Sequence, residues 1–347
     1  MKKFLSLSLA LLMTVGMLAG CGGSGSGAAS APAASSGSGS AAASTPAPAP
    51  SGEAADLTFT TGGSQGTYYG FGSVLAQYVS SNTSVNITAI ESGGSKANIE
   101  AMAEGEADLG FVQSDVMAYA YDGTRLFEGE AVDDISVAAA LYMEQVQIVT
   151  TNPDVKTVAD LKGKNVSIGA SGSGVYFNAI DVLGAYGLTE SDINATYQSF
   201  GDSADALQDG KIDAAFVVAG APTTAITSLA TAKDVYLVNL DDEHIEKLIA
   251  ESPYYTKYVI PAGTYEGLDT DTTTVAVGAV VIVNDEVSED AVYQTVSTIF
   301  ENIDAITKQH AKGGELNLEF ASSMTSIPYH PGAAKYFAEK GITVPTK

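Results

Sequence analysis

The chain of 347 residues has few of the residue types from which most metal and catalytic centres are built, with one cysteine, three histidines and one arginine. A single cysteine excludes a disulfide within the chain, and no Cys or His spacing predicts a bound metal or other cofactor. The lone Arg125 lies in a turn-like stretch that we expect to be exposed, which argues against an arginine clamp for a carboxylate. The net charge of −25 disfavours nucleic acid as a partner.

Long apolar runs are absent beyond the start of the chain. Met1-Lys2-Lys3 precedes a mostly apolar run from Phe4 to Leu18, a pattern typical of a signal peptide, which we assign to residues 1–20. This run is shorter than the roughly twenty residues that a membrane-spanning helix needs, and no later segment is long enough. We therefore expect a secreted protein.

The only cysteine follows this apolar run directly. Leu18-Ala19-Gly20-Cys21 resembles the lipobox of bacterial lipoproteins, in which the cysteine is lipidated and becomes the mature N-terminus. A diacylglyceryl group there would supply the two acyl chains that lasting membrane attachment needs. We predict Cys21 as the lipidation site of a protein that is extracytoplasmic and anchored to the cell membrane.

Composition divides the rest of the chain into a linker and a folded body. Residues 21–55 are almost entirely Gly, Ser, Ala, Pro and Thr, which predicts a disordered linker. The remainder is long enough for two lobes, each with its own core. We assign residues 56–140 and 280–347 to lobe 1 and residues 141–279 to lobe 2. Two crossovers, near residues 140–144 and 275–279, would join them.

Two copies of one pattern organise the folded body. In each copy an apolar strand, at residues 57–60 or 165–168, leads through a Gly/Ser loop into a helical pattern. About forty residues later each copy has a helix that should end at a glycine, Gly105 or Gly210, before a buried strand. Alternating strands and helices predict an α/β fold with mainly parallel sheets, whose ligands bind beyond the carboxyl ends of the strands. Two such lobes create a ligand cleft.

The candidate ligand-binding residues lie in loops that enter helices or at strand ends. Free backbone N–H groups and the helix dipole favour a carboxylate or phosphate there, and serine and threonine add hydroxyl groups. A tight turn is the alternative for either loop alone, whereas the matched pair favours binding. Asp115 is as well explained by helix capping. The predicted ligand-binding residues are Gly66, Thr67, Tyr68, Ser92, Gly93, Ser95, Asn98, Gln113, Ser171, Gly172, Ser173, Gly174, Tyr176, Ala219 and Pro222.

A serine hydrolase is an alternative, because Gly62-Gly63-Ser64-Gln65-Gly66 matches the G-x-S-x-G nucleophile elbow. A catalytic triad needs a histidine, and the three present are His244, His310 and His330. Packing accounts for His330, and glycine and serine are common enough in this chain for a chance match. We therefore expect no enzymatic activity. Neither dinucleotide-binding nor Walker motifs occur in the folded body.

These segments together resemble the TAXI family, the solute receptors of a subset of tripartite ATP-independent periplasmic (TRAP) transporters. The segments that carry the resemblance are residues 63–69, 92–98, 105–115, 141–142, 163–174, 215–222 and 329–333. The resemblance implies a two-lobed type II periplasmic-binding-protein fold. It also implies that the ligand is an amino acid such as glutamate or a related organic acid, delivered to integral membrane TRAP subunits. One of these segments, residues 105–111, is by itself also similar to receptors of ABC importers. A receptor of an ABC importer therefore stays open as an alternative.

Two positions depart from the TAXI pattern. Gly70 stands where the family often has proline, and Val175 stands where a threonine often follows Gly-Ser-Gly. Without the threonine hydroxyl, one hydrogen bond to a ligand is lost. The ligand can therefore differ from the better known ligands of the family. We expect lobe 1 to hold the ligand first and the loop at residues 171–174 to close onto it.

Overall fold

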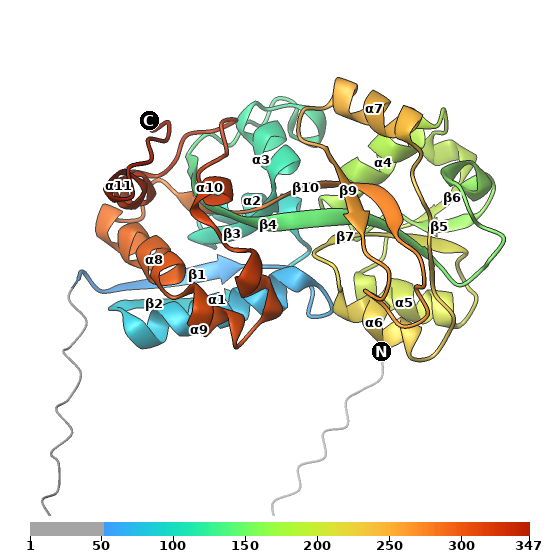
Figure 1. Cartoon of the computed structure of the whole chain (residues 1–347). Coiled ribbons are helices and arrows are strands. Elements are labelled where there is room, and N and C mark those ends of the chain that lie inside the picture. Colours follow the sequence, from blue (N-terminus) through green and yellow to red (C-terminus); the bar gives the residue numbers. More distant parts are fainter. Residues whose placement is uncertain (1–51) are drawn as a thin grey trace, which may run out of the picture. The chain divides into compact units, whose positions relative to one another are not determined.

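The computed structural model describes residues 52–347 (Figure 1). The predicted signal peptide, Cys21 and most of the predicted linker lie outside the described residues. The last linker residues are described and contact the folded body: the Glu53 N–H donates to Asp290 at 2.7 Å, and Ala55 begins the first strand. None of the helices in residues 52–347 combines the length and the apolar character that a bilayer crossing requires.

The strands form one sheet in the order β2-β1-β3-β10-β4-β7-β5-β6, with β8 beside β4 and β9 beside β10. Their bounds are β1 Ala55–Thr60, β2 Val85–Ile90, β3 Leu109–Gln113, β4 Ile135–Thr150, β5 Asn165–Ser167, β6 Asn194–Thr196, β7 Ala214–Ala219, β8 Tyr236–Leu237, β9 Thr256–Ile260 and β10 Thr272–Asn284. The pairs β1–β2, β1–β3, β5–β6 and β5–β7 are parallel. The predicted α/β fold is confirmed. The sheet is not mainly parallel, however, because the pairs that involve β4 and β10 are all antiparallel: β10–β3, β10–β4, β10–β9, β4–β7 and β4–β8.

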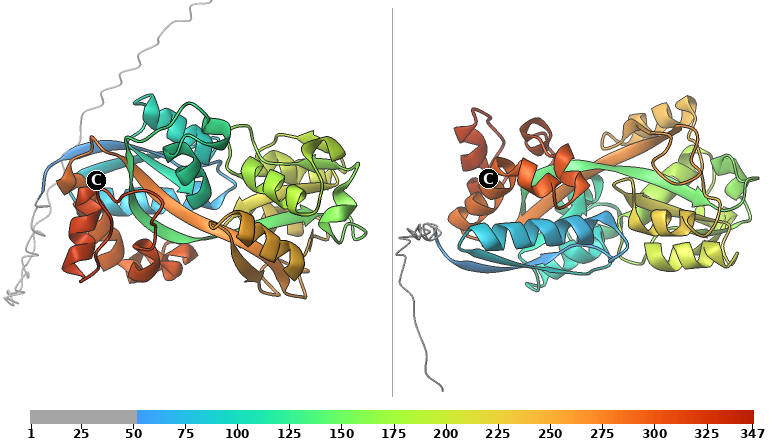
Figure 2. Two further views of the ribbon diagram at one scale, coloured as in Figure 1. Left: turned by 90° about the horizontal axis from the view of Figure 1, so that it is seen from above. Right: turned by 60° about the horizontal axis from the view of Figure 1, so that its bottom comes forward.

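Helices cover both faces of this sheet (Figure 2). The α-helices are α1 Thr67–Asn82, α2 Ser95–Ala103, α3 Ser114–Tyr121, α4 Val175–Ala185, α5 Phe200–Gln208, α6 Thr224–Ala230, α7 Asp242–Glu251, α8 Glu289–Glu301, α9 Ile303–Thr307, α10 Leu318–Ala321 and α11 Pro331–Glu339. The 3-10 helices are η1 Arg125–Phe127, η2 Val158–Leu161, η3 Glu190–Asp192 and η4 Ala311–Glu315. As predicted, α2 and α5 each end before a glycine of positive φ, at Gly105 and Gly210.

Two long antiparallel strands, β4 and β10, run through both halves of the sheet and appear side by side in green and orange in Figure 1. Both are rich in Val, Ile, Ala and Thr and are buried along nearly their whole length. Strands covered on both faces have continuous apolar sequences instead of alternating ones. Their pairing shifts register between Ala279 and Val280, and such a bulge increases local twist.

The apolar interior is divided along these two strands. One cluster joins residues 57–142 with residues 279–344, and two others lie within residues 146–277. We call the first body lobe 1 and the second lobe 2. Phe177 of α4 is an exception, because it comes from lobe 2 but packs in the lobe 1 cluster.

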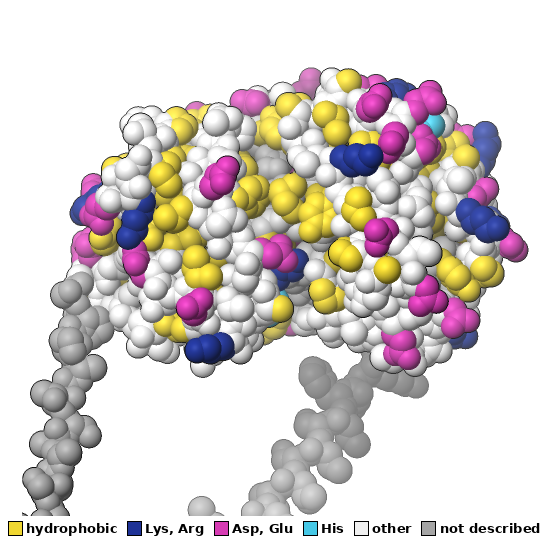
Figure 3. Space-filling view, viewed as in Figure 1, with side chains coloured by type: hydrophobic (Ala, Val, Ile, Leu, Met, Phe, Trp, Pro, Cys, Tyr) yellow, Lys and Arg dark blue, Asp and Glu magenta, His cyan; other side chains and the backbone are white. Residues whose placement is uncertain are grey.

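Asn302, whose φ of −129° is not helical, separates α8 from α9. Arg125 is exposed, as expected; its φ is 57°, and its guanidinium pairs with Asp181 of α4 in the other lobe. The acidic side chains are scattered over both lobes on the face shown in Figure 3, which fits a role in solubility.

Candidate functional site

A cavity of about 190 Å³ lies where the loops of the two lobes meet. Lobe 1 contributes the loops after β1 and β2, the end of β3, and the starts of α1 and α2. Lobe 2 contributes the loop after β5, the start of α5 and the end of β7. Glu144, in the middle of β4, also lines it. The cavity therefore lies beyond the carboxyl ends of parallel strands, as expected for this class of fold.

The structure brings ten of the predicted ligand-binding residues together around this cavity: Gly66, Thr67, Tyr68, Ser92, Gly93, Ser95, Gln113, Ser173, Gly174 and Ala219. Five others do not line it: Asn98, Ser171, Gly172, Tyr176 and Pro222.

Two of the five, Asn98 and Tyr176, have other contacts that account for them. Asn98 is fully buried, and its amide nitrogen donates to the Thr61 and Phe111 carbonyls at 2.8 and 2.6 Å. Asn98 thus connects the residue that follows β1 with the neighbouring strand β3. The Tyr176 hydroxyl donates to Glu190 at 3.3 Å, within lobe 2.

The other two loop residues lie at the seam between the lobes. The Gly172 carbonyl accepts the Ala97 N–H at 3.0 Å. A Cβ on Gly93 would come within 3.3 Å of the Ser171 carbonyl oxygen, so these loops touch through their backbones. Pro222 lies in the loop between β7 and α6, which contacts lobe 1 through the Gly220 carbonyl.

Three helices begin at the cavity wall. The N-cap residues of α1, α2 and α4 are Gly66, Gly94 and Gly174, and none of the three helices has a side-chain cap. Glycine leaves room for a ligand to approach the first-turn N–H groups closely. Uncapped N–H groups and the positive end of the helix dipole favour an anionic group.

Two buried side-chain atoms at this cavity have no hydrogen-bond partner among the described residues. They are Gln113 Oε1 and Ser173 Oγ, from residues 2% and 7% exposed. An unpaired buried polar atom costs roughly 1–3 kcal/mol.

Glu144 is the site residue of most consequence that the sequence analysis missed. It is 1% exposed, and its Oε2 accepts the Tyr68 hydroxyl at 2.5 Å. Burial raises the pKa of Glu144 to about 8, because desolvation disfavours the charged carboxylate. The available signal was a lone acidic residue within an apolar strand. The other lining residues outside the predicted set are Gly62, Gly63, Ser64, Gln65, Glu91, Gly94, Ala170, Val175, Ser199, Phe200, Gly201 and Val218.

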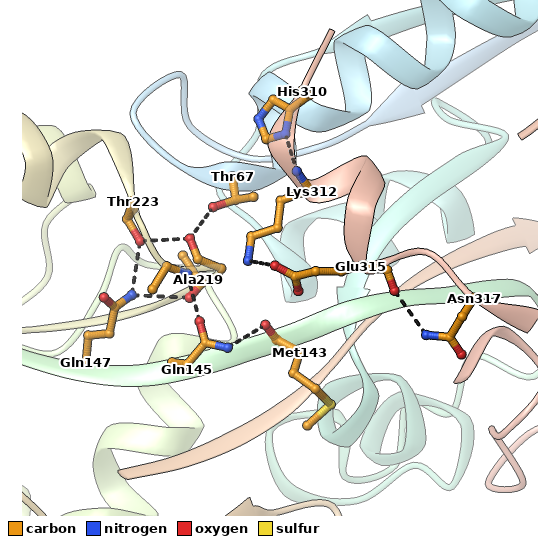
Figure 4. Close-up of polar contacts among 12 residues, drawn as sticks. Thr67, Met143, Gln145, Gln147, Ala219, Thr223, His310, Lys312, Glu315 and Asn317 are labelled. Atoms are coloured by element: carbon orange, nitrogen blue, oxygen red, sulfur yellow. Dashed lines mark hydrogen bonds and ion pairs between the residues drawn. The ribbon is translucent and has the colours of Figure 1, made fainter. Parts of the chain in front are cut away.

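The lobes are in contact on both sides of the cavity. The hydroxyl groups of Thr67 and Thr223, from opposite lobes, both donate to the Gly220 carbonyl, at 2.9 and 3.2 Å, and Figure 4 shows the two side chains converging. The Ala225 N–H donates to the Gln65 carbonyl at 3.1 Å. This is a closed arrangement of the two lobes.

The fold and the interlobe cleft define a solute-binding protein with the type II periplasmic-binding-protein fold. The chain is similar to a solved structure described as a periplasmic transporter, with 14% identity, 82% of this chain and 92% of that chain covered, and a TM-score of 0.50. A protein from Bordetella bronchiseptica RB50 matches at 18% identity, 82% and 88% coverage, and a TM-score of 0.50. The alkanesulfonate-binding protein from Xanthomonas axonopodis pv. citri matches at 16% identity, 84% and 92% coverage, and a TM-score of 0.47.

The model of the NMT1-like family matches residues 59–341. The chain therefore belongs to this family, which is the TAXI solute-binding family associated with TRAP transporters, and the predicted TAXI resemblance is confirmed.

Because the chain belongs to this family of non-enzymatic solute-binding proteins, it is a solute-binding protein of a transporter, and the serine-hydrolase alternative is excluded. The three histidines have other contacts. His244 pairs with Asp241, His310 accepts the Lys312 N–H, and His330 caps α11.

Proposed function

We propose that this protein captures a small carboxylate, an amino acid such as glutamate or a related organic acid, and delivers it to a TRAP-type membrane transporter. The observation that carries the proposal is the convergence of three uncapped helix N-termini, those of α1, α2 and α4, on one cavity. No Lys or Arg is among the residues that line it. A carboxylate would be held by backbone N–H groups and hydroxyls, without an arginine clamp.

Closure between the lobes is part of this proposal. The ligand would first meet the lobe 1 residues Thr67, Tyr68 and Ser95. Rotation about β4 and β10 would then bring Ser173 and Gly174 onto it, excluding water and strengthening its polar contacts. Backbone hydrogen bonds join the two lobes, from the Ala97 N–H to the Gly172 carbonyl and from the Ala225 N–H to the Gln65 carbonyl. They support a closed state in which the lobes contact each other largely through their backbones.

The proposal extends to the location and partner of the protein. Leu18-Ala19-Gly20-Cys21 supports a lipoprotein held outside the cytoplasm at the membrane surface. The closed form would dock on integral TRAP subunits. An ABC importer as partner is the alternative, and a neighbouring gene for an ATPase would favour it over TRAP.

Thermal unfolding of the full chain, first stripped of bound ligand by unfolding and refolding, tests the carboxylate assignment. The panel contains amino acids, dicarboxylates, 2-oxoacids and sugars. A true ligand at 100 times its dissociation constant should add about 2.7 kcal/mol to the free energy of unfolding. A melting shift with one acid class supports the proposal. A shift with sugars alone, or with none of the panel, would count against the carboxylate.

A further inference from the structure

A second set of contacts between the lobes involves helix α4. This helix belongs to lobe 2 by its place in the chain, but its first turn packs on lobe 1. Phe177 is 2% exposed and lies in the lobe 1 core cluster, and its ring centroid is 5.5 Å from that of Tyr119 on α3. The N-cap of α4, Gly174, lines the cavity. The docking of this helix on lobe 1 therefore places one wall of the ligand site.

Asn178 makes the polar part of this contact. It is fully buried. Its side-chain oxygen accepts Gln113 Nε2 at 2.8 Å, and its Nδ2 donates to Asp115 Oδ2 and to the Tyr255 hydroxyl, both at 2.9 Å. Gln113 and Asp115 belong to lobe 1, whereas Tyr255 belongs to lobe 2. One buried amide thus joins the lobes, and it also holds Gln113, which lines the cavity.

The same network continues to Arg125 of lobe 1. The Tyr255 hydroxyl donates to Asp181 Oδ2 at 3.0 Å, and the Arg125 guanidinium pairs with Asp181 Oδ1. The Arg125 side chain is 40% exposed and that of Asp181 is 15% exposed, so the ion pair is partly shielded from water. Arg125 Cζ also lies 5.0 and 5.9 Å from the ring centroids of Tyr119 and Phe177. The only arginine of the chain therefore connects the two lobes.

The backbone conformation of Arg125 supports a role for its side chain. Within residues 52–347, Arg125 is the only residue other than glycine with a positive φ. Lobe 1 itself holds this turn, because the Thr124 N–H donates to the Tyr119 carbonyl at 2.8 Å and the Phe127 N–H donates to the Thr124 carbonyl at 3.0 Å. Glycine or asparagine would fit this φ with less strain. Strain of this kind persists at functional positions, and here it accompanies the ion pair between the lobes.

We infer that Asn178 and Arg125 are positioning residues of a latch that holds α4 on lobe 1 and stabilises the closed cleft without contacting the ligand. The latch consists of Gln113, Asp115 and Arg125 of lobe 1 with Asn178, Asp181 and Tyr255 of lobe 2. Its bonds join protein groups alone, so it acts whether or not a ligand is bound. The ligand then supplies less of the free energy of closure. This inference rests on the proposed function only in assuming that the lobes open and close.

Pulsed electron paramagnetic resonance of the full chain, stripped of ligand, tests the latch through the distance between two spin labels. The labels are attached at Glu128→Cys, after η1, and at Glu246→Cys, on α7, both exposed positions, in a Cys21→Ser background that has no other thiol. With the latch intact, part of the protein should show the short distance of the closed form. The ratio of closed to open protein should fall at least about threefold in Arg125→Asn and at least about tenfold in Asn178→Ala.

Matched variants separate the latch from a merely structural role. Asparagine suits the positive φ at Arg125, so Arg125→Asn should fold. Asp181→Asn should open the protein as Arg125→Asn does, and the double variant should open it no further, because the two side chains act as one pair. The control Lys162→Asn removes an ion pair with Asp192 within lobe 2, and Asn82→Ala removes a bond to the Tyr78 carbonyl within α1. Both controls should keep the wild-type distances.

The outcomes that overturn the latch are distinct from those that overturn the carboxylate proposal. Wild-type distances in Arg125→Asn and Asn178→Ala overturn the latch, and so does a stripped wild type that shows the long distance alone. Additive opening by Arg125→Asn and Asp181→Asn removes the ion pair from it. If Asn178→Ala does not fold, the Arg125 and Asp181 variants still decide. A ligand panel that gives no melting shift counts against the carboxylate and leaves these distances as they are.

Discussion

Tyr68 combines a packing role with a polar one. Its ring stacks on Phe111 with the centroids 4.5 Å apart, and its hydroxyl donates to Glu144 at 2.5 Å. The side chain is 9% exposed, so replacing it by alanine would remove core packing, at a cost of roughly 3–5 kcal/mol. Replacement by phenylalanine keeps the ring and removes only the hydroxyl, so it tests the hydrogen bond separately from the packing.

We predict that Tyr68→Phe shifts upward the pH at which the buried Glu144 loses its proton. The Tyr68 hydrogen bond is one of the contacts that lower the pKa of Glu144, so its loss raises that pKa. The melting temperature of the ligand-free protein, measured from pH 6 to 9.5, should therefore stop falling at a higher pH than in the wild type. A profile that superimposes on the wild-type profile would remove Tyr68 from this role.

At the scale of elements, the loop between β7 and α6 closes against lobe 1. Its Gly220 carbonyl accepts the Thr67 hydroxyl. A Cβ on Gly220 would lie 2.5 Å from Lys312 Cε and 2.9 Å from a Tyr142 ring carbon. Lys312 has little freedom to move aside, because it is 5% exposed and pairs with Glu315 (Figure 4).

We therefore predict that Gly220→Ala hinders closure while both lobes stay folded, because the clash arises only where the lobes meet. Overpacking costs roughly 1–3 kcal/mol, so affinity should fall about 5- to 100-fold, with little change in the melting temperature without ligand. The matched control is Gly184→Ala, in α4, where nothing lies within 4 Å of the added Cβ. That control should bind normally and be slightly more stable. An unchanged affinity in Gly220→Ala would show that this contact does not limit closure.

The same scale explains what the sequence could and could not predict. Strand, Gly/Ser loop and helix are local patterns, so the uncapped starts of α1, α2 and α4 were predictable from residues that are neighbours in the chain. Glu144 was not, because its role depends on where the middle of β4 passes beneath loops from both lobes. Ser199 and Phe200 likewise reach the cavity only through the packing of α5 against the sheet. Tyr176 has helical spacing that suits a site, but its hydroxyl is directed at Glu190.

At the scale of the whole molecule, two buried carboxyl groups give the ligand-free protein an unusual dependence on pH. Burial raises the pKa of Asp115 to about 7 and that of Glu144 to about 8. The unfolded chain releases these protons near pH 4. Between pH 4 and about 7 the folded state therefore holds more protons than the unfolded state, and stability falls as pH rises, by about 1.4 kcal/mol per pH unit for each group.

Other carboxyl groups act in the opposite sense but in a lower pH range. The hydrogen bonds from His244 and Tyr186 lower the pKa of Asp241 to about 2. Groups of this kind stabilise the fold above about pH 4, and their contribution is lost only in stronger acid. The increasing negative charge of the chain at higher pH adds self-repulsion to the loss from Asp115 and Glu144. The two sets of groups together place the maximum stability of the ligand-free protein near pH 5.

We predict that the melting temperature of the stripped protein is highest near pH 5 and falls toward pH 8. In Glu144→Gln and Asp115→Asn this fall should be shallower, because each variant removes one buried group that must lose a proton. Scanning calorimetry at constant ionic strength from pH 4.5 to 8.5 measures all of these curves. A melting temperature that rises across that range in the stripped wild type would mean that Asp115 and Glu144 are already ionised in the ligand-free protein.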